Sequence, residues 1–254
     1  RITVDQIMDL GLTPIGLVVG GVALTILFGV GLSRVMGLGN RFGFLTGGSV
    51  AICGASAALA ITSVMPGTRE RDTIFTVIAV TTLSTIAMVL YPIGTTLIGL
   101  DEQTAGIFLG ATIHDVAQVV GAGYSLSEGT GDIATYTKLL RVAMLVPVVI
   151  GLTAFLALRG GAKTGAKGFL PPFFLVGFVA IVAINSLGLL PAILLEAMVT
   201  VSRWCLVIAI AALGIKTSLK AVTEVGVKPL ALVVLQTVFI AGFSLAVIWI
   251  CYGI

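Results

Sequence analysis

The sequence is poor in charged residues. Only 10% of its 254 residues are Asp, Glu, Lys or Arg, whereas a soluble domain carries roughly 25%. The net charge of +3 is small, so nothing in the composition indicates binding to nucleic acid. Hydrophobic residues make up 58% of the chain, and the mean hydropathy is +1.18. This composition excludes an ordinary soluble domain and predicts an integral membrane protein with many spans.

The sequence also lacks the motifs of several chemistries. Cys53, Cys205 and Cys251 stand singly in apolar runs, a spacing that indicates neither a metal site nor a redox pair. There is no nucleotide-binding loop, and one histidine cannot form the two-histidine zinc-protease pattern. The string Gly129-Thr130-Gly131-Asp132 matches Gly-x-Gly-Asp of intramembrane aspartyl proteases, but it stands in a polar connector. We therefore expect no enzyme activity, no cofactor and no metal site.

Apolar stretches of ~20 residues, the length that a spanning helix needs, recur along the chain. Two further stretches, about 43–64 and 104–123, are apolar but rich in Gly, Ser, Thr and polar groups. The stretch 160–167 is a glycine-rich linker. We predict an all-α polytopic fold in one membrane domain, 1–254, with about eight transmembrane or re-entrant segments. Two of these are expected to be discontinuous helices that meet near the midplane of the membrane. The six clear spans are expected at about 13–33, 73–97, 137–158, 170–190, 197–215 and 229–252.

An internal repeat links the two ends of the chain. Residues 9–19 align without gaps to residues 224–234, with five of eleven positions identical, including a Gly and a Pro in the polar connector. This match predicts a weak repeat of 1–39 with 216–254. An odd number of segments lies between the copies, which predicts opposite orientations, the inverted arrangement of many secondary transporters.

The basic connectors assign the sides of the membrane. By the positive-inside rule, most Lys and Arg connectors share one side, which we take as cytoplasmic. Arg69 and Arg71 join that side only if 43–64 and 104–123 both re-enter, so the charge pattern slightly favours re-entry.

The first of these two segments is unusually rich in small residues. Glycine and serine weaken a helix, so a break near Ser49, Cys53, Gly54 and Ser56 is plausible on the residues alone. A break would expose backbone N–H groups at a half-helix N-terminus, which attracts anions. The alternative is an unbroken small-residue face for tight helix packing.

The second segment holds the only histidine, His114, with Asp115 beside it and Thr112 and Gln118 nearby. On a continuous helix His114 and Gln118 would share a face. Ionisable groups are costly in the membrane and often functional, and histidine can exchange a proton near neutral pH. We therefore predict that His114 and Asp115 couple a proton or gate a substrate. The alternative is a structural histidine bonded to a carbonyl or to Asp115.

Lys138 and Arg141 stand three residues apart at the expected start of the span 137–158. They would share a helical face there and could hold an anion at the membrane edge. Equally, they could extend to the interface and anchor the helix.

At these segments the chain resembles the YeiH-like family of bacterial inner-membrane proteins, which are assigned as sulfate exporters. The resemblance covers essentially the whole chain. The family often has Glu at the position of Asp115 and begins with about three further spans, so we expect N-terminal sequence to be missing before Arg1. The matching strings are Gly48-Ser49-Val50-Ala51-Ile52-Cys53-Gly54-Ala55-Ser56, Ala111-Thr112-Ile113-His114-Asp115-Val116-Ala117-Gln118-Val119-Val120 and Ala212-Leu213-Gly214-Ile215-Lys216-Thr217-Ser218-Leu219.

The sequence and the resemblance together predict a multi-pass transporter of the bacterial inner membrane. Its substrate would be a small inorganic or sulfur-containing anion such as sulfate or sulfite, with possible proton coupling and possible homo-oligomers. One alternative is a sodium-coupled transporter of organic anions. Another is a passive channel or a structural membrane subunit. The expected substrate-binding residues are Ser49, Cys53, Gly54, Ser56, Thr112, His114, Gln118, Lys138 and Arg141.

Overall fold

The computed structural model describes residues 11–158 and 226–253, with separate positions between 184 and 208. Apart from those positions, the spans expected at 170–190 and 197–215 lie outside the described residues. So do the linker 160–167 and the repeat portions 1–10 and 216–225. In the two described stretches the regular elements are all helices, which confirms the predicted all-α polytopic membrane fold.

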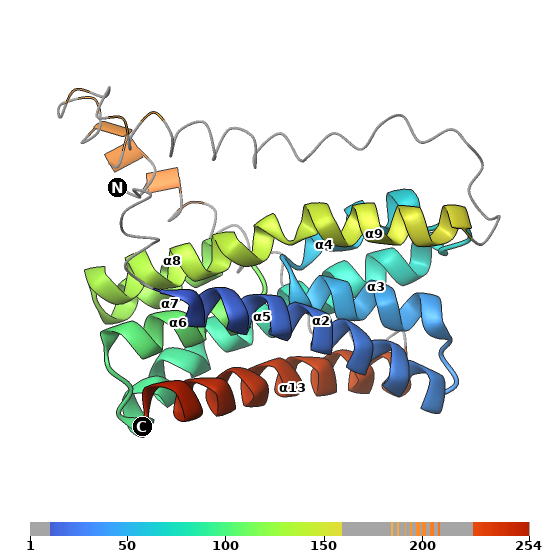
Figure 1. Ribbon diagram of the computed structural model, residues 1–254, viewed down its shortest axis with the longest axis horizontal. Coiled ribbons are helices and arrows are strands. Elements are labelled where there is room, and N and C mark those ends of the chain that lie inside the picture. Colours follow the sequence, from blue (N-terminus) through green and yellow to red (C-terminus); the bar gives the residue numbers. More distant parts are fainter. Residues whose placement is uncertain are drawn as a thin grey trace.

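The described stretches contain four helices long and apolar enough to cross a membrane. They lie side by side along the bundle in Figure 1. Helices α8 and α9 are separated only by Met144 and together make one span of 31 residues, Glu128–Leu158. These elements are α2 (Leu12–Val35), α5 (Glu70–Ile98), α8 (Glu128–Ala143), α9 (Leu145–Leu158) and α13 (Val227–Tyr252).

Helices α2 and α13 run in opposite directions. Near one end of the pair the ring of Phe243 lies over Gly20. Further along, the rings of Phe28 and Phe239 stack with centroids 4.3 Å apart. The residue numbers of the contacting positions therefore rise along α2 as they fall along α13. The opposed orientation of the two ends agrees with the odd number of segments in the sequence, while the duplication itself stays a prediction.

The four short helices pair into two hairpins that enter and leave on the same side. Helices α3 (Asn40–Ala51) and α4 (Ala55–Val64) form the first hairpin, and α6 (Glu102–Thr112) and α7 (Val116–Leu126) form the second. Each half-helix measures roughly 15–18 Å, about half the ~30 Å of the hydrocarbon core. Such lengths suit helices that stop near the middle of the bilayer.

Contacts between the two ends of each hairpin show that its second half-helix returns to the side from which the first one entered. Arg41 at the start of α3 lies against Gly67, just beyond the end of α4. Glu102 at the start of α6 lies against Gly129, just beyond the end of α7. In the structure the segments 43–64 and 104–123 are therefore both re-entrant hairpins. The sequence had left open whether they cross the membrane or re-enter.

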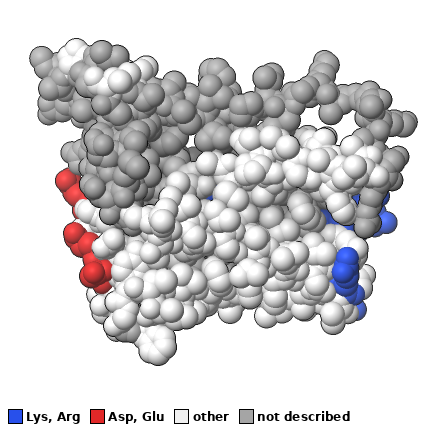
Figure 2. Space-filling model, viewed as in Figure 1, with Lys and Arg blue, Asp and Glu red and all other residues white. Residues whose placement is uncertain are grey.

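The hairpins enter from opposite ends of the bundle. Arg41, Arg69 and Arg71 line one cavity of about 570 Å³ with Pro229, and they mark a basic end. Glu102 and Glu128 begin helices at the other, acidic end. Figure 2 shows the same separation, with Lys and Arg at one end of the visible face and Asp and Glu at the other. Arg69 and Arg71 therefore join the other basic residues, as re-entry requires.

Small residues also serve close packing, the alternative considered for the first hairpin. A Cβ on Gly43 of α3 would lie 2.5 Å from the carbonyl oxygen of Gly29 on α2. A Cβ on Gly47 would lie 3.2 Å from the Cα of Ile26. Helix α3 is therefore both closely packed and interrupted, so the two interpretations of its glycines are compatible.

Candidate functional site

The tips of the two hairpins meet inside the bundle. The first tip is Ile52–Gly54, where Gly54 has φ +61° and turns the chain into α4. The second tip is Ile113–Asp115. A Cβ on Gly54 would lie 3.7 Å from the Cβ of His114. We call these two tips, with Lys138 and Arg141 of α8, the crossing.

Lys138 joins the two tips through its ammonium group. Its Nζ donates to the carbonyl oxygen of Ile52 on the first tip at 2.8 Å. It also donates to those of Ile113 and His114 on the second tip, at 2.9 and 2.5 Å. The side chain is fully buried. Because an ammonium group has three N–H donors, these three carbonyls use all of them.

Arg141 makes a parallel set of bonds one turn further along α8. It donates from Nε to the carbonyl oxygen of Ala51 at 2.8 Å and from a terminal nitrogen to that of Val50 at 2.6 Å. The other terminal nitrogen reaches Gly110 and Ile113 at 3.3 and 3.2 Å. The ends of α3 and α6 leave carbonyls without helical partners, and the two cations occupy these carbonyls.

The positions of Lys138 and Arg141 correct one prediction. They do not begin a span at the membrane edge, because α8 begins at Glu128. Ten residues of helix place Lys138 ~15 Å from that start, about half the thickness of the hydrocarbon core. Both side chains are 0–1% exposed, so neither anchors the helix at the interface.

The two half-helices that leave the crossing differ at their first residues. Helix α7 is capped by Asp115, whose carboxylate accepts from the N–H of Ala117 at 2.9 Å. Helix α4 follows Gly54, which offers no side-chain cap. The first N–H groups of α4 therefore lack the carboxylate acceptor that α7 has, at the positive end of a helix dipole. The thiol of Cys53, on the first tip, interacts with one of them, the N–H of Ala57.

His114 lies in the break and not on a helix, which corrects the expectation that it shares a helical face with Gln118. Its backbone N–H donates to Ser84 Oγ at 3.1 Å, and its Nε2 lies 3.0 Å from Thr237 Oγ1. The side chain is completely buried. Among the described residues its Nδ1 has no hydrogen-bond partner. The imidazole thus connects the second tip to α13.

Four predicted polar residues have other surroundings. The hydroxyl of Ser49 donates to Leu45 O of its own helix, and that of Thr112 donates to Phe108 O. Gln118 donates to Thr85 Oγ1 at 2.8 Å, while its buried Oε1 has no partner among the described residues. Ser56 is exposed. These four residues are therefore not gathered around one common point by these bonds.

Cys53 remains at the crossing. It lies on the first tip, is 5% exposed, and interacts electrostatically with Lys138 and Arg141. The structure thus brings together Cys53, Gly54, His114, Asp115, Lys138 and Arg141.

Sequence reasoning did not identify three residues of the spans that hold the crossing in place. Ser84 of α5 accepts from both His114 and Asp115 N–H groups, each at 3.1 Å. Thr237 of α13 contacts the imidazole, and its neighbour Gln236 donates to Thr46 Oγ1 at 3.0 Å. Their signal was available, since each is a polar residue in a long apolar span.

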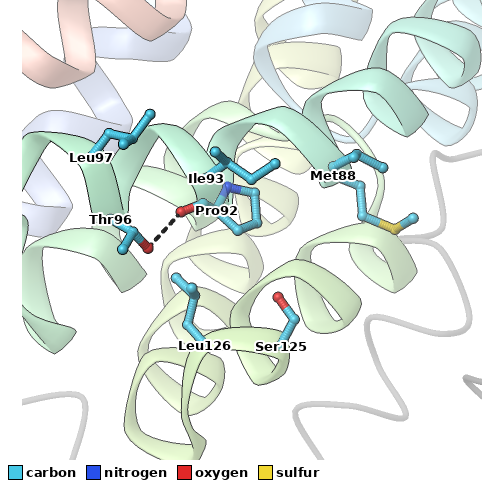
Figure 3. A pocket seen from close by; sticks show the side chains of 8 residues that line it. Met88, Pro92, Ile93, Thr96, Leu97, Ser125 and Leu126 are labelled. Atoms are coloured by element: carbon cyan, nitrogen blue, oxygen red, sulfur yellow. Dashed lines mark hydrogen bonds between the residues drawn. The ribbon is translucent and has the colours of Figure 1, made fainter.

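A second cavity lies away from the crossing. It has a volume of about 450 Å³ and is lined mainly by apolar side chains of α5, with Ser125 and Leu126 of α7. Figure 3 shows Pro92 in this groove and the bond from Thr96 Oγ1 to Pro92 O, 3.0 Å long. None of the predicted site residues lines it, so it is not the candidate site.

Comparison with known proteins identifies relatives but no structural precedent. The model of a family described as conserved hypothetical protein 698 matches residues 1–233. A UPF0324 membrane protein of Chlorobaculum tepidum is 57% identical over 254 residues, covering 98% of this chain and 71% of its own length. The UPF0324 membrane protein TauZ of Paracoccus pantotrophus is 52% identical over 250 residues, 97% and 74% of the two chains. No solved structure matches.

Proposed function

Since the chain belongs to the conserved hypothetical protein 698 family of UPF0324 membrane proteins, we propose that it is a secondary transporter. It exports a small anion, sulfate or a related sulfur oxyanion, across a bacterial inner membrane, with its basic end in the cytoplasm. This family match agrees with the resemblance to the YeiH-like proteins. The transport activity and substrate class are inferred from the crossing and from that resemblance.

The observation that carries the proposal is an excess of positive charge near the middle of the membrane. Lys138 and Arg141 contribute +2 and Asp115 contributes −1, a formal balance of +1. The other described acidic residues lie at the helix starts and connectors of the two ends. Uncompensated buried charge is costly. A bound anion would reduce this cost, and a bound cation would increase it.

The uncapped start of α4 supplies the second element that an oxyanion needs. Backbone N–H groups at a helix N-terminus bind sulfate or phosphate through hydrogen bonds and the helix dipole. This N-terminus faces the second tip, because Gly54 is in contact range of His114. Lys138 and Arg141 would provide charge rather than direct hydrogen bonds, since Lys138 has all its donors occupied.

The same contacts argue against sodium at this site. Transporters with broken helices hold Na⁺ through unwound backbone carbonyls. Here the carbonyls of Val50, Ala51 and Ile52 already accept from Lys138 or Arg141. A sodium ion would have to displace a buried cation. The anion proposal is therefore favoured over the sodium-coupled alternative.

The cavity at the basic end fits an entry route for anions. Three arginines, Arg41, Arg69 and Arg71, line about 570 Å³ of space there. Clustered positive charge raises the local concentration of anions and their rate of arrival. Asp72 also lines the cavity and partly offsets this charge.

Efflux from proteoliposomes tests the proposal. We expect saturable loss of labelled sulfate or sulfite that protein-free liposomes do not show. We expect reduced efflux with His114→Ala. Unchanged transport would remove His114 from the mechanism. Sodium-dependent flux would favour the sodium-coupled alternative, and single-channel conductance would favour a channel. The absence of flux for any small oxyanion would overturn the proposal.

A further inference from the structure

The hydrogen bonds of Lys138 depend on its protonation state. Three carbonyl oxygens surround Nζ at 2.5–2.9 Å, which matches the three N–H donors of an ammonium group. A neutral amine has two N–H donors and one lone pair. That lone pair would face a carbonyl oxygen, and one buried acceptor would lose its donor. A buried acceptor without a partner is costly.

Arg141 cannot switch between a charged and a neutral form as Lys138 can. A guanidinium stays charged in proteins, so its bonds to Val50, Ala51, Gly110 and Ile113 persist at any working pH. The two cations of the crossing therefore have different roles. Arg141 is a permanent connection between the hairpins, whereas Lys138 can lose a proton and change the local charge.

We propose that the proton carried with the anion is bound at Lys138. With Lys138 protonated the crossing has a formal charge of +1 and accepts an anion. When the anion leaves, the proton passes from Nζ to water on the same side, and the formal charge of the crossing falls to zero. Anion and proton thus travel together. This inference rests on the proposed transport function and deepens it, since it names the coupling residue.

Other ionisable groups around Lys138 bear on this assignment. Arg141 on the same helix, Cys53 on the first tip and Asp115 on the second tip interact with it electrostatically. His114 contributes a carbonyl to Nζ, and Tyr91 of α5 interacts with Arg141. Of this set, Lys138 alone both donates hydrogen bonds to the two tips and carries a proton that a side chain of its type can release. The earlier assignment of the proton to His114 and Asp115 is the rival that the test must separate.

Thermodynamic linkage gives the expected result. If binding of the anion requires the proton, each strengthens the binding of the other by the same factor. The Kd for sulfate then rises about tenfold per pH unit once the pH exceeds the value at which Lys138 titrates. Below that value it is constant. Sulfate suits this measurement because its own charge does not change from pH 5 to 9.

The test measures sulfate binding by calorimetry in detergent across this pH range. In weakly buffered solution the wild-type protein should take up about one proton per sulfate bound at the alkaline end. Lys138→Arg keeps the charge and cannot release a proton, so its sulfate binding should be independent of pH and without proton uptake. Lys228→Arg makes the same change at an exposed position of α13 and should behave as wild type.

Each outcome decides between the possibilities. If Lys138→Arg keeps the wild-type pH dependence and proton uptake, the inference is wrong while anion transport stands. If His114→Gln or Asp115→Asn removes the proton uptake instead, the proton belongs to the second tip. Wild-type binding without proton uptake overturns the inference even if the Lys138 variant does not fold. No sulfate binding at any pH overturns the inference, and loss of flux for every small oxyanion overturns the function as well.

Discussion

The two hairpins have the same architecture but differ at the N-termini of their half-helices. Each has two half-helices and a three-residue tip, Ile52–Gly54 or Ile113–Asp115. In the second hairpin a carboxylate caps both half-helices, Asp101 for α6 and Asp115 for α7. In the first hairpin glycine precedes both, Gly39 for α3 and Gly54 for α4, and neither has a side-chain cap.

This difference shows how one architecture can give two roles. In the second hairpin the carboxylate of Asp115 occupies the N-terminus of α7. In the first hairpin no carboxylate occupies the N-terminus of α4 at the same place. We infer that the first hairpin holds the anion, while the second positions the imidazole and the carboxylate.

The largest effect is expected from Arg141→Met, which removes the permanent connection between the hairpins. It leaves the carbonyls of Val50, Ala51 and Gly110 buried without this donor. Each lost partner costs ~1–3 kcal/mol. Part of this is offset because no charge is then buried. We expect a loss of about 3 kcal/mol, measured by unfolding in detergent, with Arg141→Lys less affected. Unchanged stability would show that these bonds do not hold the tips.

The next effect compares one glycine from each hairpin. A Cβ on Gly110 of α6 would overlap the carbonyl oxygen of Ala134 on α8 and lie 2.7 Å from the Cβ of Thr137. A Cβ on Gly48 of α3 would meet only the mobile end of the Ile61 side chain. Gly110→Ala should therefore cost ~1–3 kcal/mol, the usual range for overpacking.

Gly48→Ala is the matched control and should cost clearly less, because the Ile61 side chain can adopt another rotamer. Thermal unfolding of both variants in the same detergent gives the comparison. Equal losses would show that the Ile61 side chain cannot move aside, and that Gly48 is as closely packed as Gly110.

Substitutions of Asp115 separate its cap from its charge. Asp115→Ala removes the α7 cap and should cost ~1 kcal/mol. Asp115→Asn keeps a good cap and should leave stability nearly unchanged. It also raises the formal charge of the crossing from +1 to +2, so sulfate should bind about tenfold more tightly.

Calorimetry with sulfate and thermal unfolding measure the two effects independently. Weaker sulfate binding by Asp115→Asn would show that the carboxylate contacts the substrate or its proton directly. It would contradict the role assigned here, which is to cap α7 and to lower the net charge.

The smallest effect concerns the entrance of the second hairpin at acidic pH. Hydrogen bonds from the side chain and backbone of Thr104 lower the pKa of Asp101. A lowered pKa in the folded state stabilises the fold at pH values above the unfolded pKa of ~3.9. That contribution disappears as the pH falls through the folded value. The first hairpin has glycine at the corresponding position and lacks this dependence.

Asp101→Asn should therefore flatten the acid side of the stability profile. Thermal unfolding between pH 3 and pH 6 measures this, with the wild-type protein as reference. Parallel profiles for the two proteins would show that the Asp101 carboxylate contributes nothing to this end of the hairpin. At neutral pH the difference should be small, because Asn is also a good N-cap.

The sequence predicted that two helices are interrupted better than it predicted the contacts that the residues at the interruptions make. Glycine and serine density favoured a break near Gly54 in the first segment, because these residues weaken a helix locally. The second segment was also predicted to be a discontinuous helix, but no residue type placed its break at Ile113–Asp115. The helical face shared by His114 and Gln118 was wrong because the break itself removes the histidine from the helix.

Other parts of the site had no local signal. The partners of Lys138 and Arg141 are backbone carbonyls, which every residue carries, so no residue type marks them. The spacing of three residues between Lys138 and Arg141 was evident from the sequence. The predicted start of their helix, however, lay too far along the chain. The string from Gly129 to Asp132 was assigned to a connector, whereas it forms part of the first turns of the helix. This shift moves both cations from the membrane edge to the interior.

The sequence alone determined that the chain is an α-helical membrane protein, because a shortage of charge and long apolar runs leave no other stable state. It also favoured a break in the first interrupted segment, since glycine and serine weaken a helix over a few residues. The tertiary structure decided that both interrupted segments return to their own side and that two cations of α8 join their tips. Those contacts connect residues up to 91 positions apart, and their energy arises only when separate helices exclude lipid and water together.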